Sequence, residues 1–362
     1  MRGNRSLLLV FIALVMLATG CRKYNELSSL SSPAYIRVFN MITNTPTIFH
    51  NGESNTFLTF LMDPVMDKSN VPQSAPIVGD FLTTRQLFTT SYPTDAANTV
   101  VGTGYVNYEY PGREHVLMAP PLNGFECSSW AQITSGKHRI VFLSRPPSSV
   151  PFDSLTEVQR SQVIADTTID FQAGELYTLE AILQDLATFT YAVYARKEDF
   201  VHKNYSEDSL YVGFYKVCAT IPSGPYNVYS PVFSWFYDSL ALSANYFTWN
   251  YVLQKPDTVA GGGFRTDTIS GRFTSQPKYM VFPAVPQSAF FDPVGQPGTV
   301  PWINLSIAPF INLGGYGISF SLNQVSTVGS HIQIYPTVNI MEIVNDRVYR
   351  TQVLKVASKI PQ

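Results

Sequence analysis

Apolar and polar residues alternate with a period of two in many short stretches of the chain, which is the pattern of half-buried β-strands. Clear examples are residues 34–39 (AYIRVF), 137–143 (KHRIVFL), 167–171 (TTIDF), 175–183 (ELYTLEAIL), 190–195 (TYAVYA) and 210–217 (LYVGFYKV). Residues 338–344 and 347–356 flank the pair Asn345-Asp346, which predicts a β-hairpin. Turns rich in Pro, Gly and Asn separate these stretches, and together they predict an all-β fold.

Two stretches depart from this pattern. Ser154 and Glu157 have the spacing of a capping box at the start of SLTEVQRSQVIAD, which predicts a helix over 154–166 in a connection between strands. Residues 287–317 are rich in Pro and Gly, and we expect a long loop there.

The composition favours sandwiches over helical packing. Charged residues make up 14% of the chain and aromatic residues another 14%, and 25 prolines and 22 glycines are spread along it. About 340 residues after the leader exceed what one compact core usually holds, so we expect two domains. The charged run at 196–203 (RKEDFVHK) has the character of a solvated connection, which sets the predicted boundary. The first domain then covers 34–203 and the second 204–362.

A weak internal repeat agrees with two domains in tandem. Residues 267–282 (DTISGRFTSQPKYMVF) are similar to residues 166–181 (DTTIDFQAGELYTLEA). An Asp and a Tyr lie eleven residues apart in the earlier copy and twelve apart in the later one. Repeats of this kind indicate duplicated architecture, here with a diverged second copy.

The N-terminus has the parts of an export signal. Arg2 and Arg5 precede an apolar run from Leu7 to Ala18, which is shorter than the roughly 20 residues that a spanning helix needs. Small residues and then Cys21 follow, and the whole resembles a bacterial lipoprotein signal. The resemblance implies a signal peptide at 1–20 and a lipidated Cys21. The alternative is an ordinary secretory leader cut after Gly20, with Cys21 unmodified.

The residues after the leader bear on localisation. Two or more acyl chains on Cys21 would give stable membrane anchoring. In lipoproteins an Asp after the Cys resembles an inner-membrane retention signal, and this chain has Arg22 there. We therefore expect a lipid-anchored protein of the cell outer membrane, facing the periplasm or the cell surface. Residues 21–33 are short and polar after the Cys, which predicts a flexible tether.

Three motifs in the first domain resemble a known exported family. They are AYIRVFN at 34–40, SGKHRIVFL at 135–143 and DTTIDFQAGELYTLEAI at 166–182. Their pattern is similar to that of the domain of unknown function 4397, over about 170 residues. In this resemblance Gly136 and Gly174 are turn residues and Tyr177 is a strand aromatic. It implies an immunoglobulin-like β-sandwich in an exported protein and no particular activity. Together with the chain length and the internal repeat, it leads us to expect two tandem immunoglobulin-like sandwiches after the signal peptide.

Charge and motif content exclude several classes of function. Without Arg2 and Arg5, 22 basic residues face 26 acidic ones and the net charge is −4, so we expect no nucleic-acid partner. The five histidines are scattered without metal-ligand spacing, so no metal site or cofactor is expected. Asp166 and Asp170 are best interpreted as solvated turn residues rather than a catalytic pair. We predict that the protein is not an enzyme.

An aromatic segment at 233–251 (FSWFYDSLALSANYFTWNY) is the main candidate for binding. If its two aromatic runs are strands, Trp235 and Trp249 each lie on a face with two further rings. Such a face is either part of a sandwich core or a platform on which sugar rings or peptides stack. The half-polar opposite face of the second run, with Tyr246 and Thr248, favours the core.

Two features concern modification. Asp followed by Ser or Thr recurs in a context that resembles a bacterial O-glycosylation site, although both residue types also favour turns. The hydroxyls concerned are Ser154, Thr167, Ser209, Ser239, Thr258 and Thr268. Cys127 and Cys218 either form a disulfide, which export permits, or remain free and buried.

The sequence thus predicts a membrane-anchored envelope lipoprotein that acts as a non-catalytic binding or scaffolding module. Its partners would be the membrane and either a glycan or another envelope protein. The alternative function is a glycan-binding lipoprotein of an outer-membrane uptake system.

Overall fold

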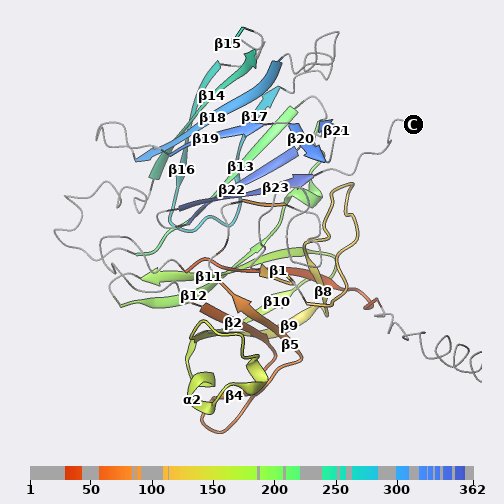
Figure 1. The fold of residues 1–362 in the computed structure, drawn as a ribbon, viewed down its shortest axis with the longest axis vertical. Coiled ribbons are helices and arrows are strands. Elements are labelled where there is room, and N and C mark those ends of the chain that lie inside the picture. The colour runs from red at the N-terminus through yellow and green to blue at the C-terminus, as the bar shows by residue number, and fades with distance from the viewer. Residues whose placement is uncertain are drawn as a thin grey trace, which may run out of the picture. The chain divides into compact units, whose positions relative to one another are not determined.

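Figure 1 shows the fold of the chain in a computed structural model. Contacts group Ser31–Gln362 into one compact unit, apart from Met1–Leu30. The structure describes residues 29–42, 57–83, 85, 88–90, 109–112, 114–185, 188–206, 209–220, 239–250, 253–257, 263–283, 299–309, 318–323, 325–328, 331–334, 337–344 and 347–354. Most of these residues lie in β-strands, which confirms the predicted all-β class.

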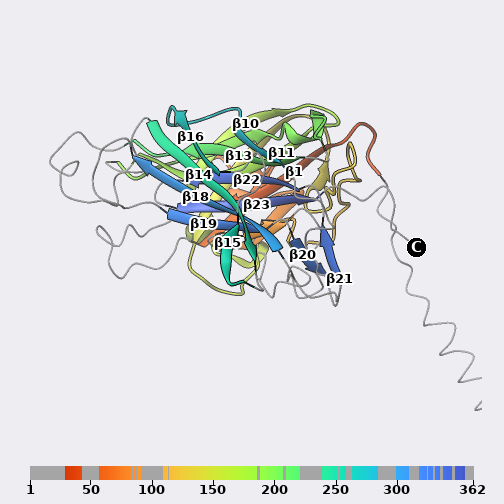
Figure 2. The ribbon, with the colours of Figure 1, turned by 90° about the horizontal axis from the view of Figure 1, so that it is seen from above.

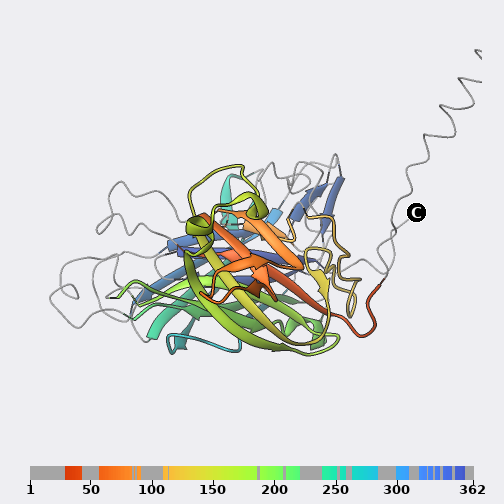
Figure 3. The same ribbon diagram turned by 90° about the horizontal axis from the view of Figure 1, so that it is seen from below.

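The first half of the described chain forms a sandwich of two sheets. Sheet 1 has the order β12 (Thr190–Lys197), β11 (Leu176–Asp185), β1 (Ala34–Asn40) and β7 (Glu109–Tyr110), and β8 (Ala131–Ile133) also pairs with β1. Sheet 2 has the order β10 (Val163–Phe171), β9 (Gly136–Arg145), β2 (Phe57–Met62) and β5 (Ile77–Leu82). In Figure 3 the orange strands β2 and β5 are seen from below.

Alternation along the strands builds the core between these sheets. Ile36 and Val38 of β1 pack in one buried cluster with Phe60 of β2, Phe142 of β9 and Leu179 of β11. Rings in this cluster make tilted contacts, such as Phe60 with Phe142 at a centroid distance of 5.6 Å. Burial of large apolar side chains is the main stabilising contribution to a sandwich of this kind.

The strands of the second half, joined by β6 from the first half, form two further sheets, and Figure 2 shows the second-half strands from above. Sheet 3 has the order β17 (Lys278–Pro283), β13 (Ser209–Val217), β22 (Thr337–Val344), β23 (Arg347–Leu354) and β6 (Phe88–Thr90). Sheet 4 has the order β15 (Lys255–Asp257), β14 (Ser239–Asn250), β18 (Thr299–Pro309) and β19 (Ile318–Asn323), and β16 (Gly263–Ser270) also pairs with β14. The Tyr246 ring contacts Phe282 at 5.5 Å, which joins sheet 4 to sheet 3.

The two halves repeat one strand order. β1 pairs in parallel with β11, which pairs antiparallel with β12, and in the same way β13 pairs in parallel with β22, which pairs antiparallel with β23. In sheet 2 the strand β2 lies between β5 and β9, and in sheet 4 the strand β14 lies between β16 and β18. The described strands therefore form two tandem sandwiches of like topology. The exact domain boundary at 203/204 stays a prediction.

The similar segments 166–181 and 267–282 do not occupy equivalent positions in the two sandwiches. The earlier segment leads into β11, which pairs in parallel with β1, and the later one leads into β17, which pairs antiparallel with β13. The counterpart of β11 in the second sandwich is β22, since β22 is the strand that pairs in parallel with β13.

Sheet 1 also packs against sheet 3 through its second face. Tyr35 and Leu176 share a buried cluster with Tyr215 of β13 and Ile340 of β22. A neighbouring cluster joins Phe39 of β1 to residues of β13, β22 and β23, namely Val217, Val344 and Tyr349. All seven residues of β1 are consequently buried, although its alternating sequence predicts one solvated face.

The remaining elements are short. Two small sheets pair β3 (Val65–Met66) with β4 (Pro72–Ser74) and β20 (Val325–Val328) with β21 (His331–Ile334). The helices are the 3-10 turns η1 (Phe152–Ser154) and η2 (Phe200–His202) and the α-helix α2 (Glu157–Arg160). Gly174 has φ of +79°, in the left-handed region that favours glycine, in the turn between β10 and β11 that the sequence predicts there.

Two predictions about irregular segments are wrong. The helix covers four residues rather than 154–166, because the capping box is made by Thr156 and Gln159 and the chain from Val163 onward joins sheet 2 as β10. The predicted loop at 287–317 contains β18, whose eleven residues all pair with β14. The predicted hairpin at the end of the chain is confirmed by the pairing of β22 with β23.

Candidate functional site

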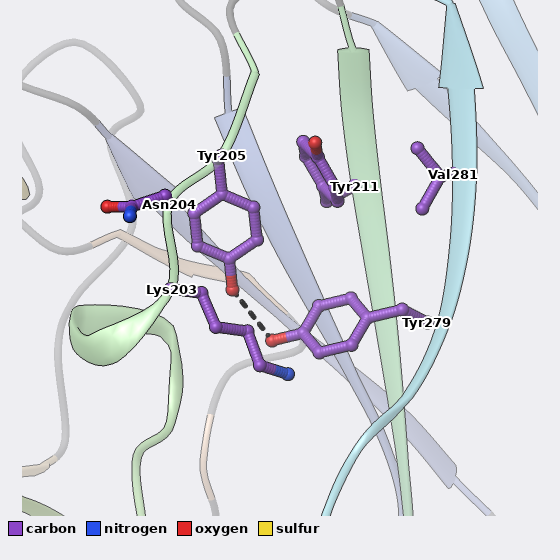
Figure 4. Close-up of a pocket in the computed structure, with 6 residues that line it drawn as sticks. All are labelled: Lys203, Asn204, Tyr205, Tyr211, Tyr279 and Val281. Carbon is purple, nitrogen blue, oxygen red and sulfur yellow. Dashed lines mark hydrogen bonds between the residues drawn. The ribbon is translucent and has the colours of Figure 1, made fainter.

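A pocket of about 250 Å³ opens where the chain leaves η2 and enters β13. Three tyrosines form its walls, and we call it the tyrosine pocket (Figure 4). Its lining residues are Lys203, Asn204, Tyr205, Tyr211, Tyr279 and Val281. Lys203, Asn204 and Tyr205 come from the connection between the sandwiches, whereas Tyr211 belongs to β13 and Tyr279 and Val281 to β17.

Strand register brings Tyr211 and Tyr279 together. β13 and β17 are antiparallel, with Tyr211 opposite Val281 and Gly213 opposite Tyr279. A Cβ atom on Gly213 would lie 2.9 Å from Cε1 of Tyr279, a distance that real side chains avoid. The missing side chain at Gly213 therefore makes room for the Tyr279 ring.

The tyrosine hydroxyls form a directed chain of hydrogen bonds. The Tyr279 hydroxyl donates to Oδ1 of Asp199 over 3.0 Å. Because a phenol has one proton, the 2.9 Å contact between the Tyr205 and Tyr279 hydroxyls must be donated by Tyr205. Burial raises the pKa of both phenols, so both stay protonated at neutral pH.

The ring of Tyr205 is held by edge-to-face contacts. Its centroid lies 4.5 Å from that of Tyr211 and 5.5 Å from that of Phe125, at interplanar angles of 71° and 89°. The Tyr211 hydroxyl accepts a hydrogen bond from the backbone N–H of Ser206 over 3.1 Å, which ties the connection to the start of β13. The Tyr177 hydroxyl does the same for Gln172 in the first sandwich, over 3.0 Å and with the same spacing of five residues.

Charged groups at the rim of the pocket are paired. Nζ of Lys203 lies 4.0 Å from the centroid of the Tyr279 ring and forms an ion pair with the Asp199 carboxylate. The Asn204 side chain is exposed, and Val281 is 38% exposed. The site thus combines aromatic walls with a few polar groups and little net charge, which is the general character of a small-molecule binding site.

A second group of charged residues lies buried between sheets 1 and 3, and we call it the interface cluster. At its centre Nη1 of Arg196 lies 3.2 Å from Oε1 of Glu180, and Nη2 lies 2.8 Å from Oε1 of Glu198. Arg196 and Arg85 both form ion pairs with Glu342 of β22. None of these side chains is more than 2% exposed.

Charges in the interface cluster shift one another's pKa. Burial and the neighbouring Glu342 carboxylate raise the pKa of Glu180 to about 8. Burial acts in the same direction on Glu342, but the guanidiniums of Arg196 and Arg85 outweigh it and lower its pKa to about 2. Arg37, also fully buried, stacks 4.0 Å from the Trp130 ring and lies 3.7 Å from the Glu109 carboxylate. Because the cluster is closed to solvent, we expect its charged groups to affect the stability of the fold rather than to bind a ligand.

The prediction that the charged run 196–203 is solvated is therefore wrong for Arg196 and Glu198. Arg196 is 2% exposed and Glu198 is 1% exposed, because sheet 3 covers this end of β12. Lys197 and His202 do point to solvent, with 43% and 53% of their side chains exposed.

Several predicted site residues lie outside the described part of the chain, namely Cys21, Trp235 and Thr258. Trp249 lies within β14, in register with Pro256 of β15 and Val300 of β18. The buried face of β14 carries Leu240, Leu242, Ala244 and Tyr246, and Phe247 is half-buried. The stacking role of Trp235 and Trp249 stays a prediction.

The candidate O-glycosylation hydroxyls differ in exposure. Ser154 is exposed in η1, whereas Thr167, Ser209, Ser239 and Thr268 lie half-buried in strands. Ser239 also donates a hydrogen bond to Ser270 over 3.2 Å. Ser154 is thus the most accessible of those described.

The two remaining cysteines are free and buried rather than joined by a disulfide. Burial raises the pKa of Cys127 to about 12, so its thiol stays protonated and unreactive. Within the described residues, no group of three or more His, Cys, Asp or Glu side chains is placed to hold a metal ion. The same part of the chain contains no helix of sufficient length and hydropathy to span a membrane.

Sequence reasoning missed both the tyrosine pocket and the interface cluster. The pocket joins Tyr205 to Tyr279, which are 74 residues apart, and the cluster joins Arg196 to Glu342, which are 146 apart. The sequence offered one signal: the predicted strand at 210–217 contains Tyr211 and Tyr215, with Gly213 between them.

No family model matches the chain, and no match was found among curated proteins. A candidate cell adhesion protein from Bacteroides uniformis is 9% identical to it, over 90% of this chain and 100% of that one, with a TM-score of 0.17. The tip fimbrial protein Mfa3 from Porphyromonas gingivalis, with a C-terminal truncation, is 10% identical over 89% of this chain and 99% of that one, with a TM-score of 0.18. TM-scores this low carry no argument about the fold or the function of this chain. Its all-β class follows from its own strands.

Proposed function

We propose that this protein is a non-catalytic binding module of the cell envelope, held to the outer membrane by lipid on Cys21. The observation that carries the proposal is the tyrosine pocket, which is open to solvent and built on two paired strands of sheet 3. Aromatic walls with a few convergent polar groups are suited to binding.

The chemistry of the described charged groups supports binding rather than catalysis. A catalytic acid or base must come within hydrogen-bond reach of its substrate. The carboxyls with the largest described pKa shifts, Glu180 and Glu342, are sealed between two sheets with 0% of their side chains exposed. In the pocket itself the phenols of Tyr205 and Tyr279 are protonated at neutral pH and already hydrogen-bonded.

Lipid anchoring is tested by replacing Cys21. We expect Cys21→Ser to abolish labelling by radioactive palmitate and to move the protein out of the membrane fraction. The matched control is Cys127→Ala, since Cys127 is buried and unreactive and should leave labelling unchanged. Retained label in Cys21→Ser, or a mature N-terminus beyond residue 21, would contradict the anchor.

The binding role is tested separately from the anchor. The Cys21→Ser protein is fluorescently labelled and titrated onto outer membranes isolated from the host cells. A bulky side chain at Val281, which lines the pocket and is 38% exposed, should block the pocket without entering the core, so we expect Val281→Trp to weaken this binding at least tenfold. Equal binding by both proteins would reject the pocket as the binding site.

A glycan-binding lipoprotein of an outer-membrane uptake system is the second candidate, and the aromatic walls of the pocket favour it. It predicts that the acylated protein co-purifies with an outer-membrane transporter from detergent extracts. Trp235→Ala and Trp249→Ala test the separate aromatic platform, because only the platform predicts that they weaken glycan binding.

A further inference from the structure

We infer that the tyrosine pocket binds one neutral pyranose ring of a glycan. This inference rests on the proposed binding function and names the class of ligand for that site. It follows from three properties of the pocket: the chemistry of its walls, the hydrogen-bonding groups at its rim and its charge.

The walls suit a flat, partly apolar ring. Tyr205, Tyr211 and Tyr279 are half-buried, and Figure 4 shows their side chains arranged around one space with Val281 at its edge. One face of a pyranose consists of C–H bonds, which carry slight positive charge. Such a face is complementary to the electron-rich face of a tyrosine ring. The 38% exposed Val281 side chain extends the apolar surface.

Groups at the rim match sugar hydroxyls, which both donate and accept hydrogen bonds. Tyr205 gives its only proton to Tyr279, so its oxygen can accept one from a ligand. The Lys203 ammonium beside it supplies donors, whereas the exposed Asn204 amide points away from the three tyrosine rings in Figure 4.

The charge of the site favours a neutral sugar. The Lys203 ammonium is balanced by the Asp199 carboxylate, with which it forms an ion pair. A phosphate or a uronic acid would have to compete with Asp199 for this ammonium. A cationic ligand would be repelled by Lys203, whose Nζ already lies over the Tyr279 ring at 4.0 Å.

The size of the pocket limits the ligand to a small unit. Its volume of about 250 Å³ lies below the roughly 300 Å³ at which sites for drug-sized molecules begin. One ring of a longer glycan fits this limit. Because a single sugar has few heavy atoms, we expect a dissociation constant of about a millimolar.

The test titrates the full acylated chain in detergent with the methyl glycosides of mannose, glucose, galactose and N-acetylglucosamine. Binding is followed by saturation-transfer NMR and calorimetry. We expect at least one neutral glycoside to bind, and Val281→Trp and Tyr205→Leu to weaken it at least tenfold. The matched control is Phe264→Ala, which removes a ring that is 71% exposed on β16 and should leave binding unchanged. Circular dichroism confirms that each variant is folded.

Each other outcome overturns the inference. If no glycoside binds but Val281→Trp still weakens outer-membrane binding, the sugar assignment fails and the binding function stands. If neither binding is seen, both fail. Tighter binding of glucuronate, inorganic phosphate or choline would replace the neutral class, and sugar binding that Val281→Trp leaves unchanged would place the sugar elsewhere on the protein.

Discussion

At the scale of single residues, the fold depends on charges that lie out of reach of water. Arg196 makes ion pairs with Glu180, Glu198 and Glu342, and its side chain is 0% exposed. Buried ion pairs are not strong contributors when compared with apolar packing, but removing one partner leaves the others uncompensated. This asymmetry makes the interface cluster sensitive to single substitutions.

Replacing the central arginine measures this sensitivity. We expect Arg196→Ala to lower the free energy of unfolding by about 3–5 kcal/mol, because the buried Glu198 carboxylate loses its guanidinium partner and Glu342 keeps only Arg85. The control is Arg139→Ala, whose ion pair with Asp166 is 38% and 37% exposed, and we expect a loss of about 0–1 kcal/mol. Urea denaturation followed by circular dichroism gives both values. A loss for Arg196→Ala as small as the control would show that the cluster does not form.

The raised pKa of Glu180 makes stability depend on pH. The folded chain holds this proton up to a pKa of about 8, whereas the ordinary glutamate value is 4.5, so the folded state binds more protons between these values. Stability from this group therefore falls as the pH rises from about 4.5 to about 8. Glu342, with its pKa lowered to about 2, acts oppositely: its contribution is lost as the pH falls from 4.5 through 2.

Glu180→Gln separates these two effects. The amide cannot titrate, so we expect the variant to lose less thermal stability than the wild type between pH 5 and pH 8.5. Below pH 4 both proteins should lose stability in parallel, since Glu342 is unchanged. Melting temperatures across this range supply the measurement, and identical profiles would mean that Glu180 titrates normally.

At the scale of elements, β13 carries more of the architecture than its length suggests. It lies between β17 and β22 in sheet 3. Because Gly213 at its centre has no side chain, the Tyr279 ring can pack against the backbone there. We expect Gly213→Ala to cost about 1–3 kcal/mol through overpacking. The same change should weaken ligand binding, because Tyr279 would have to move. Ser209→Ala, at the half-buried start of the same strand, is the control for both measurements.

Helix α2 offers a local test of capping. The backbone N–H of Gln159 donates to Oγ1 of Thr156 over 3.3 Å, and the Gln159 side chain accepts from the Thr156 backbone over 3.0 Å. We expect Thr156→Ala to speed hydrogen exchange at the Gln159 amide. Ser154→Ala, at the position that the sequence pattern selects as the cap, should leave that exchange rate unchanged. The reverse result would restore the cap at Ser154.

At the scale of the molecule, the two sandwiches share an interface that neither half can satisfy alone. Sheet 1 supplies Arg196 and Glu180, and sheet 3 supplies Glu342. The segment after β5 passes from the first sandwich to sheet 3 of the second. There Arg85 pairs with Glu342, and β6 adds a parallel strand beside β23. Separation would expose both the charges and the apolar clusters around them.

We therefore expect the intact protein to unfold in one calorimetric transition. Residues 34–203 and 204–362 expressed separately should be insoluble, and co-expression should restore a soluble complex. Two soluble, folded and monomeric halves, whose circular dichroism spectra add up to that of the intact chain, would show that the sandwiches are independent.

The sequence by itself determined the all-β class, the positions of β1, β9, β10, β11 and β12 in the first half, and the closing hairpin. These features are local, since strand alternation and turn residues such as Gly174 act over a few positions. The sequence did not predict β2 and β5 of sheet 2. Local patterns misled where a neighbouring strand outweighed them, as in the predicted helix that β10 shortens and the predicted loop that contains β18.

Only the tertiary structure decided which strand faces meet water and which side chains meet each other. The alternation in β1 predicts one wet face, and sheet 3 covers that face because the second sandwich docks there. The sequence predicts that the charged residues at 196–198 are solvated. In the structure Arg196 is buried and pairs with Glu342, which lies 146 residues further along the chain. The tyrosine pocket likewise depends on the register of β13 with β17, which no local pattern encodes.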